Sequence, residues 1–105
     1  GFRYRLNHPR LPGRPDIVLR KYRTCIFING CFWHGHEGCK YYVIPKSNTE
    51  FWTRKITRNI ERDKQVQQEL ARMGWHCMTI WECELKPKKR EQTLLALEYT
   101  LNIFT

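Results

Sequence analysis

Residues 30–39 constrain this chain more than any other segment, because they place two cysteines, two histidines and two adjacent aromatic residues within ten positions. The segment reads Gly-Cys-Phe-Trp-His-Gly-His-Glu-Gly-Cys. Thiolate and imidazole ligands at such short spacing are typical of tetrahedral zinc sites. A short loop bounded by glycines cannot turn both Phe32 and Trp33 into a core, so we expect at least one of these rings to project outward, where it can stack on nucleic-acid bases.

The spacing of Cys31, His36 and Cys39 is Cys-x4-His-x2-Cys, which predicts three ligands of one zinc ion. The alternative is that the two thiols are simply buried and His36 is a surface imidazole. His34 lies close enough in the sequence to compete with His36 for the metal, and the spacing leaves that choice open.

Five cysteines fit poorly with a complete set of disulfides, and in a reducing compartment they favour metal binding. Cys25 and Cys77 lie in apolar, strand-like runs and are expected to be small buried hydrophobic residues. Cys83, which follows the last predicted strand, is the natural fourth ligand. The sequence does not exclude Cys77 from that position.

The charge of the chain suggests its partner. Its 105 residues are enough for one domain over residues 1–105, and they carry 19 lysines and arginines against 10 acidic residues, a net charge of +9. Such a surplus favours a polyanionic partner bound through counterion release, although ordinary solvation or attraction to a membrane surface would also explain it. We find no apolar run near the roughly 20 residues that span a bilayer and no signal peptide, so we expect a soluble, cytoplasmic protein and no membrane partner.

Apolar residues alternate or run continuously in segments that predict four strands, at residues 2–6, 16–19, 24–29 and 75–81. A long helix is predicted from the capping-box spacing of residues 47–50 to a stop at Gly74, and a second helix covers residues 91–103. We expect Phe51 to enter the core. The order strand, strand, strand, helix, strand, helix predicts an α/β fold in which a mixed sheet is flanked by helices.

Asp16 follows a rigid Pro-Gly-Arg-Pro turn and opens a strand. A carboxylate in this position, near a buried strand that leads to His34, can hold Mg²⁺, whose remaining ligands are water and substrate phosphates. The metal would polarise a phosphodiester, and the imidazole would assist proton transfer. Taken alone, Asp16 is better explained as an ordinary turn or capping residue.

Six blocks of the sequence, in order, resemble the very short patch repair endonucleases, bacterial enzymes that nick one strand beside a T:G mismatch. The blocks are residues 11–16, 30–34, 50–52, 55–63, 74–75 and 81–83. The resemblance runs through most of the chain from about Leu11 to Leu85. It implies a restriction-endonuclease-like fold with a catalytic Mg²⁺ and a structural Zn²⁺, acting on double-stranded DNA that carries a T:G mismatch; we expect a monomer.

The resemblance also implies residue roles. Asp16 would be the catalytic magnesium ligand, and the backbone carbonyl of Ile28 a second one. His34 would be the catalytic histidine, supported by Asp63 from the long helix. The implied zinc ligands are Cys31, His36, Cys39 and Cys83.

Aromatic and polar residues carry the implied contacts with DNA. Phe32, Trp33 and Trp52 correspond to the aromatic residues that wedge into DNA beside the mismatch, and Lys55, Arg58 and Asn59 are assigned to DNA binding on the long helix. Core packing is the simpler physical reading of Trp52, and a solvated helix face is the simpler reading of the basic residues.

The chain departs from the family at several positions. Asn29 stands where the family has a histidine, which removes any auxiliary proton transfer there, and Gly35 and Glu37 replace part of a histidine-rich loop. The family also has a helical segment before the first strand, and we expect this chain to lack it.

The sequence is therefore consistent with two functions: a magnesium-dependent endonuclease that nicks one strand, and a zinc-stabilised DNA-binding module, truncated or degenerate, without cleavage activity. A small basic ribosome-associated zinc protein would explain the charge but not the Pro-Asp turn.

Overall fold

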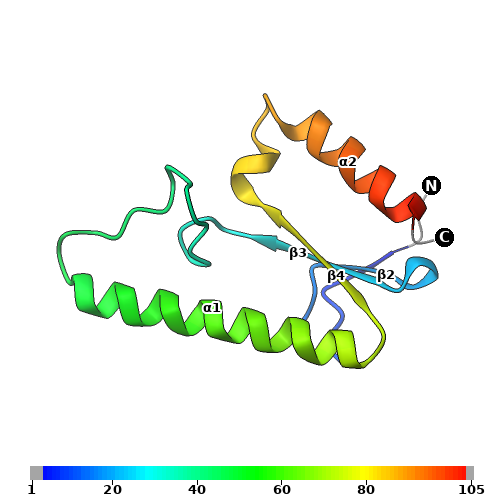
Figure 1. Cartoon of the computed structure of the whole chain (residues 1–105), viewed down its shortest axis with the longest axis horizontal. Coiled ribbons are helices and arrows are strands. Elements are labelled where there is room, and N and C mark those ends of the chain that lie inside the picture. The colour runs from blue at the N-terminus through cyan, green and yellow to red at the C-terminus, as the bar shows by residue number, and fades with distance from the viewer. Residues whose placement is uncertain (1–3, 104–105) are drawn as a thin grey trace.

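The computed structural model describes residues 4–103 and confirms the predicted α/β class, with a mixed four-stranded sheet and a helix on each of its faces (Figure 1). The elements in order are β1 (Arg5–Leu6), β2 (Ile17–Leu19), the 3-10 helix η1 (Arg20–Tyr22), β3 (Thr24–Asn29), α1 (Thr49–Arg72), β4 (His76–Trp81), the 3-10 helix η2 (Glu82–Leu85) and α2 (Arg90–Ile103). Among the described residues no helix combines the length and apolar character needed to cross a membrane.

The sheet order is β1-β2-β3-β4, antiparallel for the first two pairs and parallel for β3 and β4. The parallel pair is the predicted strand–helix–strand passage through α1. Its register sets Asn29 opposite Trp81 and Cys25 opposite Cys77. The carboxyl ends of β3 and β4 therefore lie side by side, and whatever follows each strand emerges at the same edge.

Alternation along the strands divides the core into two layers, because successive side chains of a strand point to opposite faces. Val18 and Cys25 pack with Leu70 of α1, whereas Leu19 and Ile26 pack with Leu101 of α2. Burial raises the pKa of the Cys25 thiol to about 12, which keeps this thiol neutral in the core. The expectation that Cys25 is a buried hydrophobic residue is confirmed; Cys77 is only partly buried.

Two predicted boundaries shift. The first strand was expected over residues 2–6, but the structure shows Arg5–Leu6 only, and residues 2 and 3 lie outside the described part. The capping box expected at residues 47–50 is wrong: Asn48 is the N-cap, in a left-handed conformation, without a side-chain capping bond. Instead, the hydroxyl of Thr49 donates backward to the carbonyls of Pro45 and Lys46, at 3.0 and 3.1 Å.

The expectation that Phe51 enters the core is also wrong, since its side chain is 51% exposed. The reason is length. A helix of 24 residues extends about 36 Å, whereas the six residues of β3 or β4 extend only about 20 Å. The first turns of α1 therefore project past the end of the sheet, as Figure 1 shows, and have no strand to cover.

Candidate metal centre and active-site cleft

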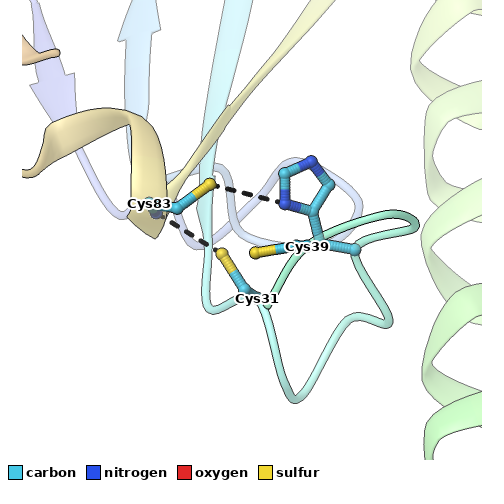
Figure 2. A group of neighbouring side chains, drawn as sticks. Cys31, Cys39 and Cys83 are labelled. Carbon is cyan, nitrogen blue, oxygen red and sulfur yellow. Dashed lines mark hydrogen bonds between the residues drawn. The ribbon is translucent and has the colours of Figure 1, made fainter. Parts of the chain in front are cut away.

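Four metal-ligating side chains converge beyond the ends of β3 and β4. The thiol sulfurs of Cys31, Cys39 and Cys83 and a ring nitrogen of His36 all lie within 4.8 Å of one another. Figure 2 shows the three labelled sulfurs pointing toward a common centre. The four residues are the ligand set that the resemblance implies. Neither His34 nor Cys77 belongs to this cluster.

The parallel register explains how a residue 44 positions away from Cys39 joins the loop. Asn29 lies opposite Trp81, and Cys31 and Cys83 each follow these partners by two residues. The two cysteines consequently leave the sheet as neighbours. Cys77, in contrast, pairs with Cys25 within the strands and lies in the α1 layer of the core.

Contacts around the four side chains hold them in place. The backbone N–H of Cys83 donates to the sulfur of Cys31 at 3.4 Å, and the sulfur of Cys83 lies 3.5 Å from Nδ1 of His36. The imidazole of His36 stacks on Trp81, with ring centroids 4.1 Å apart and planes only 5° from parallel. Trp81 thus orients a candidate ligand, a contact that the sequence analysis did not predict. Nothing in the sequence except its place two residues before Cys83 points to it.

The pKa values of two thiols in the cluster shift in opposite directions. A backbone hydrogen bond at Tyr41 lowers the pKa of Cys39, whereas burial and the neighbouring thiols raise the pKa of Cys83 to about 11. A divalent metal bound by these sulfurs would release any protons they carry, because cysteine ligates metals as the thiolate.

The donor set fits zinc. Zn²⁺ prefers four nitrogen and sulfur ligands at about 2.0–2.3 Å, which places donors roughly 3.4–3.8 Å apart in a tetrahedron. The observed spread of up to 4.8 Å needs a contraction of about 1 Å to reach that geometry. Sulfur-rich tetrahedral sites suit zinc far better than magnesium or calcium, which bind oxygen. These four residues could hold a metal ion, and all four coordination positions would then belong to the protein.

A second constellation begins at Asp16. The turn before it is tight: Gly13 and Arg14 both have positive φ, and the N–H of Arg14 donates to the carbonyl of Leu11 at 3.1 Å. Asp16 then accepts a hydrogen bond from the backbone N–H of Ile28 through Oδ2, at 2.7 Å. This bond fixes the carboxylate against the exposed end of β3.

His34 approaches the same region from the loop after β3. Its Nδ1 lies 2.6 Å from Oδ2 of Asp63 on α1, and both side chains are about a quarter exposed. The turn can pack this closely because Gly35 follows with φ +60°, and a Cβ there would lie 2.6 Å from Ile60 of α1. A carboxylate bound at Nδ1 leaves Nε2 of the imidazole facing away from it, as in sites where a histidine transfers protons.

Asp16, His34 and Asp63 line one cleft of about 390 Å³. Asn29, only 8% exposed, reaches the cleft between them. This placement brings Asp16 and His34 to the same open cleft. Arg14 and Arg62 also line it and were not singled out. The signal that could have found Arg62 is its position beside Asp63 and one helical turn after Asn59.

An aromatic cluster lies beside the cleft. Phe32, Trp33 and Trp52 pack edge to face, with ring centroids 5.3–5.7 Å apart. Phe51, lying beyond the sheet, contacts Trp52 at 5.1 Å. Trp33 remains 47% exposed, so the expectation of an outward-facing ring is confirmed.

Polar residues of α1 connect this cluster to the cleft. Lys55 places its ammonium 5.5 Å from the Trp33 ring centroid, and the amide of Asn59 donates to the Trp33 carbonyl at 2.9 Å. Arg62, a cleft residue, donates to Asn59 at 3.1 Å. Arg58 lies exposed on the same helix, with no bond that links it to the cluster. The aromatic surface and the cleft therefore form one continuous region along α1.

Known proteins with similar sequences are named as DNA mismatch endonucleases or nicking enzymes. The family model described as DNA mismatch endonuclease Vsr matches residues 1–40. A type II nicking enzyme of Neisseria meningitidis, V.NmeAIP, is 57% identical over 88 residues, which cover 84% of this chain and 62% of that enzyme.

Two further relatives resemble it. The DNA mismatch endonuclease Vsr of Escherichia coli K12 is 42% identical over 90 residues, 86% of this chain and 57% of that protein. The type II nicking enzyme V.XorIIP of Xanthomonas oryzae is 46% identical over 85 residues, 81% of this chain and 62% of that enzyme. The chain thus spans about three fifths of the length of these relatives.

Proposed function

This chain is Vsr-like, and we propose that it is a DNA endonuclease that nicks one strand beside a T:G mismatch by magnesium-dependent hydrolysis. The relatives that match most of the chain are named as mismatch endonucleases or nicking enzymes. The same relationship supports a single restriction-endonuclease-like domain over residues 1–105, and we propose that it acts as a monomer.

The observation that carries the proposal is the shared cleft. Asp16, which directly precedes β2, lines the same open space as His34 from the loop after β3 and Asp63 from α1. Asp16, His34 and Asp63 lie 18 or more residues apart in sequence, so local structure alone does not bring them together. Arg14 and Arg62 add positive charge, which attracts a phosphate into the cleft.

Asp16 and the Ile28 carbonyl would hold Mg²⁺. In a strand, the N–H and C=O of one residue point to the same side, so the bond from the Ile28 N–H to Asp16 places the carbonyl on the side of the carboxylate. Two oxygens suffice for magnesium, since water and phosphate oxygens complete its octahedron. When bound, the metal would polarise the phosphodiester and lower the pKa of a water ligand.

His34 would move the proton. Asp63 accepts a hydrogen bond from Nδ1 and fixes the ring, which leaves Nε2 to take a proton from the attacking water or to stabilise charge on the phosphate. Asp63 acts through His34 and is a positioning residue. Water would add to the phosphorus as one P–O ester bond breaks, so the cut strand would end in a phosphate on one side of the nick and a hydroxyl on the other, without a covalent enzyme intermediate.

Zn²⁺ in the cysteine–histidine cluster would be structural. Its four positions would be filled by Cys31, His36, Cys39 and Cys83, which leaves none for substrate. Cys31 directly precedes the Phe32-Trp33-His34 run. The metal would thus fix the loop that presents both the wedge and the catalytic histidine.

The aromatic cluster would bind selectively at the mismatch. Phe32, Trp33 and Trp52 form a wedge that can enter a base step from one groove, with Lys55, Arg58 and Asn59 beside it on α1. Opening a step costs a few kcal/mol, and a mispair that stacks poorly lowers this cost. The lower cost of opening the mismatched step would then contribute to selection of T:G, in addition to direct contacts with the protein.

One observation favours the second function, a zinc-stabilised DNA-binding module without cleavage. Asn29 is almost fully buried at the cleft where the family has a histidine, and an amide cannot exchange a proton. A site with one imidazole in place of two would bind DNA through the wedge and yet hydrolyse it slowly.

The deciding experiment is a nicking assay on T:G and T:A duplexes of otherwise identical sequence, with and without added Mg²⁺ and without chelators that would remove zinc. We expect nicking of the T:G duplex only when Mg²⁺ is added. Asn29→His is the matched variant: binding without nicking in the unaltered chain, together with nicking in the variant, would establish the binding-module function.

A further inference from the structure

A pocket away from the cleft is lined by basic side chains from three segments. Arg5, His8, Arg10, Arg20 and Lys21 surround a depression of about 570 Å³, and among the described residues no acidic side chain lines it. Arg5 lies on β1, His8 and Arg10 follow that strand, and Arg20 and Lys21 follow β2. Residues distant in sequence have therefore been gathered around one space.

Within residues 4–103, none of these basic side chains forms an ion pair with an acidic side chain. Among residues 4–103 the ion pair between His34 and Asp63 is the only one, and it lies in the cleft. The basic pocket's side chains make few contacts within the protein: Nδ1 of His8 accepts the backbone N–H of Arg10 at 3.2 Å, and Lys21 lies near its neighbour Tyr22. Assembling like charges around a depression is unfavourable unless an anion occupies it.

The pocket and the cleft are joined by β2. Asp16 directly precedes this strand and Arg20 directly follows it, and Arg5 pairs with Val18 between them. Four residues of extended chain separate Asp16 from Arg20 by roughly 13 Å, which is about four base-pair steps at 3.4 Å each. A duplex with its scissile phosphate at Asp16 thus has backbone phosphates at a distance that suits the pocket.

We propose that this basic pocket is a second DNA contact, which binds backbone phosphates of the duplex a few base pairs from the scissile phosphate. It holds the duplex without reading its sequence, because every duplex offers the same phosphates. The proposal rests on the proposed function only in that the same DNA occupies the cleft. A polyanion is favoured over a lipid surface, since the pocket is continuous through β2 with the cleft residues and is concave.

The test is a pocket variant, Arg20→Gln with Lys21→Gln, compared with a control of equal charge change, Arg72→Gln with Lys46→Gln. Both control residues are exposed and line none of the pockets described above. Binding to T:G and to T:A duplexes is measured between 50 and 200 mM salt. We expect the pocket variant to bind both duplexes about tenfold more weakly, with a salt slope smaller by about 1 to 2, because each lost phosphate contact removes close to 0.9 from the slope. The preference for T:G should not change.

Three further measurements distinguish the ways in which the proposal could fail. Shortening the duplex to within three base pairs of the mismatch should weaken the unaltered protein and leave the pocket variant unaffected. Equal behaviour of pocket and control variants overturns this inference even when nicking is normal, whereas absence of nicking with a reduced salt slope overturns only the proposed function.

If the pocket variant loses binding to phosphatidylserine vesicles while it keeps its DNA affinity, the pocket is a lipid site and the inference is wrong. Unchanged thermal melting shows that both variants are folded.

Discussion

The cysteine–histidine cluster and the cleft use neighbouring residues of one loop in opposite ways. The cluster takes four donors that lie within 4.8 Å of one another and can enclose a cation completely. The cleft gathers Asp16, His34 and Asp63 around an open space of about 390 Å³. A closed set of ligands stabilises structure, whereas an open set leaves room for a substrate. Only two residues separate Cys31 from His34, so the closed site fixes the geometry of the open one.

The sharpest way to separate the two regions is Asp16→Asn. The amide is a poor magnesium ligand, and we expect nicking to fall by at least about 10⁴-fold, equivalent to about 5.5 kcal/mol in the activation barrier. DNA affinity should stay the same or rise, because a charge that repels phosphate is removed. Zinc content, measured by elemental analysis, should be unchanged. A variant that lost zinc or unfolded would contradict the separation of cluster and cleft.

The next test is His34→Ala, because His34 lies between the two regions and competes with His36 in the sequence. Loss of its imidazole should lower nicking by about 10³-fold, or about 4 kcal/mol in the barrier, which is within the range of a lost acid–base group.

Its zinc content should stay at one per chain, since the ring nitrogen of His34 is bound to Asp63 and not to the thiols. The control is His36→Ala, which should lose zinc. The reverse pattern, with zinc lost from His34→Ala, would leave only the binding-module function.

Removal of a cluster ligand should act on both regions at once. Cys83→Ser breaks the link between the loop and η2, and we expect a loss of at least about 2 kcal/mol in the free energy of unfolding, or roughly 10 °C in melting temperature. Nicking should fall in parallel, because the loop that carries His34 is no longer fixed.

Cys77→Ala is the matched control. It removes a thiol of the core and should keep the metal. A metal-free wild-type protein, or zinc retained by Cys83→Ser and lost from Cys77→Ala, would show that the ligand set is wrong.

The two regions also differ in how far the sequence predicts them. The spacing of Cys31, His36 and Cys39 predicts a metal loop by itself, but the choice of Cys83 over Cys77 depends on the register of β3 with β4, which no local pattern encodes. The cleft was predicted only through a resemblance, since Asp16 and His34 alone are ordinary residues. Asp63 lies 29 positions from His34, and its contact depends on how α1 crosses the loop.

For the fold as well, the sequence predicts some features and not others. Period-two alternation in the strands and three- or four-residue periodicity in α1 predict the elements, because both patterns follow from local geometry. The errors lie where the sheet ends. Phe51 fits the apolar stripe of the helix, yet α1 outruns the strands and leaves it exposed. Glu50 has the spacing of a capping box. The N-cap of α1 is nevertheless Asn48 in a left-handed conformation, and its side chain makes no capping bond.

The smallest expected effect concerns Trp33, which belongs to neither region and joins them. Trp33→Ala should leave zinc content and the nicking rate at saturating T:G duplex within a few fold of the unaltered chain. Its preference for T:G over T:A in binding should fall by about fivefold, close to 1 kcal/mol, because stacking on a base is worth about 1–3 kcal/mol and Phe32 and Trp52 remain. Competition binding at one salt concentration measures this ratio directly. The control is Tyr99→Ala on α2, an aromatic residue 70% exposed on the other side of the sheet, which should change nothing. Equal weakening of both duplexes in Trp33→Ala would mean that the ring supplies general affinity and that discrimination resides in the polar residues of α1.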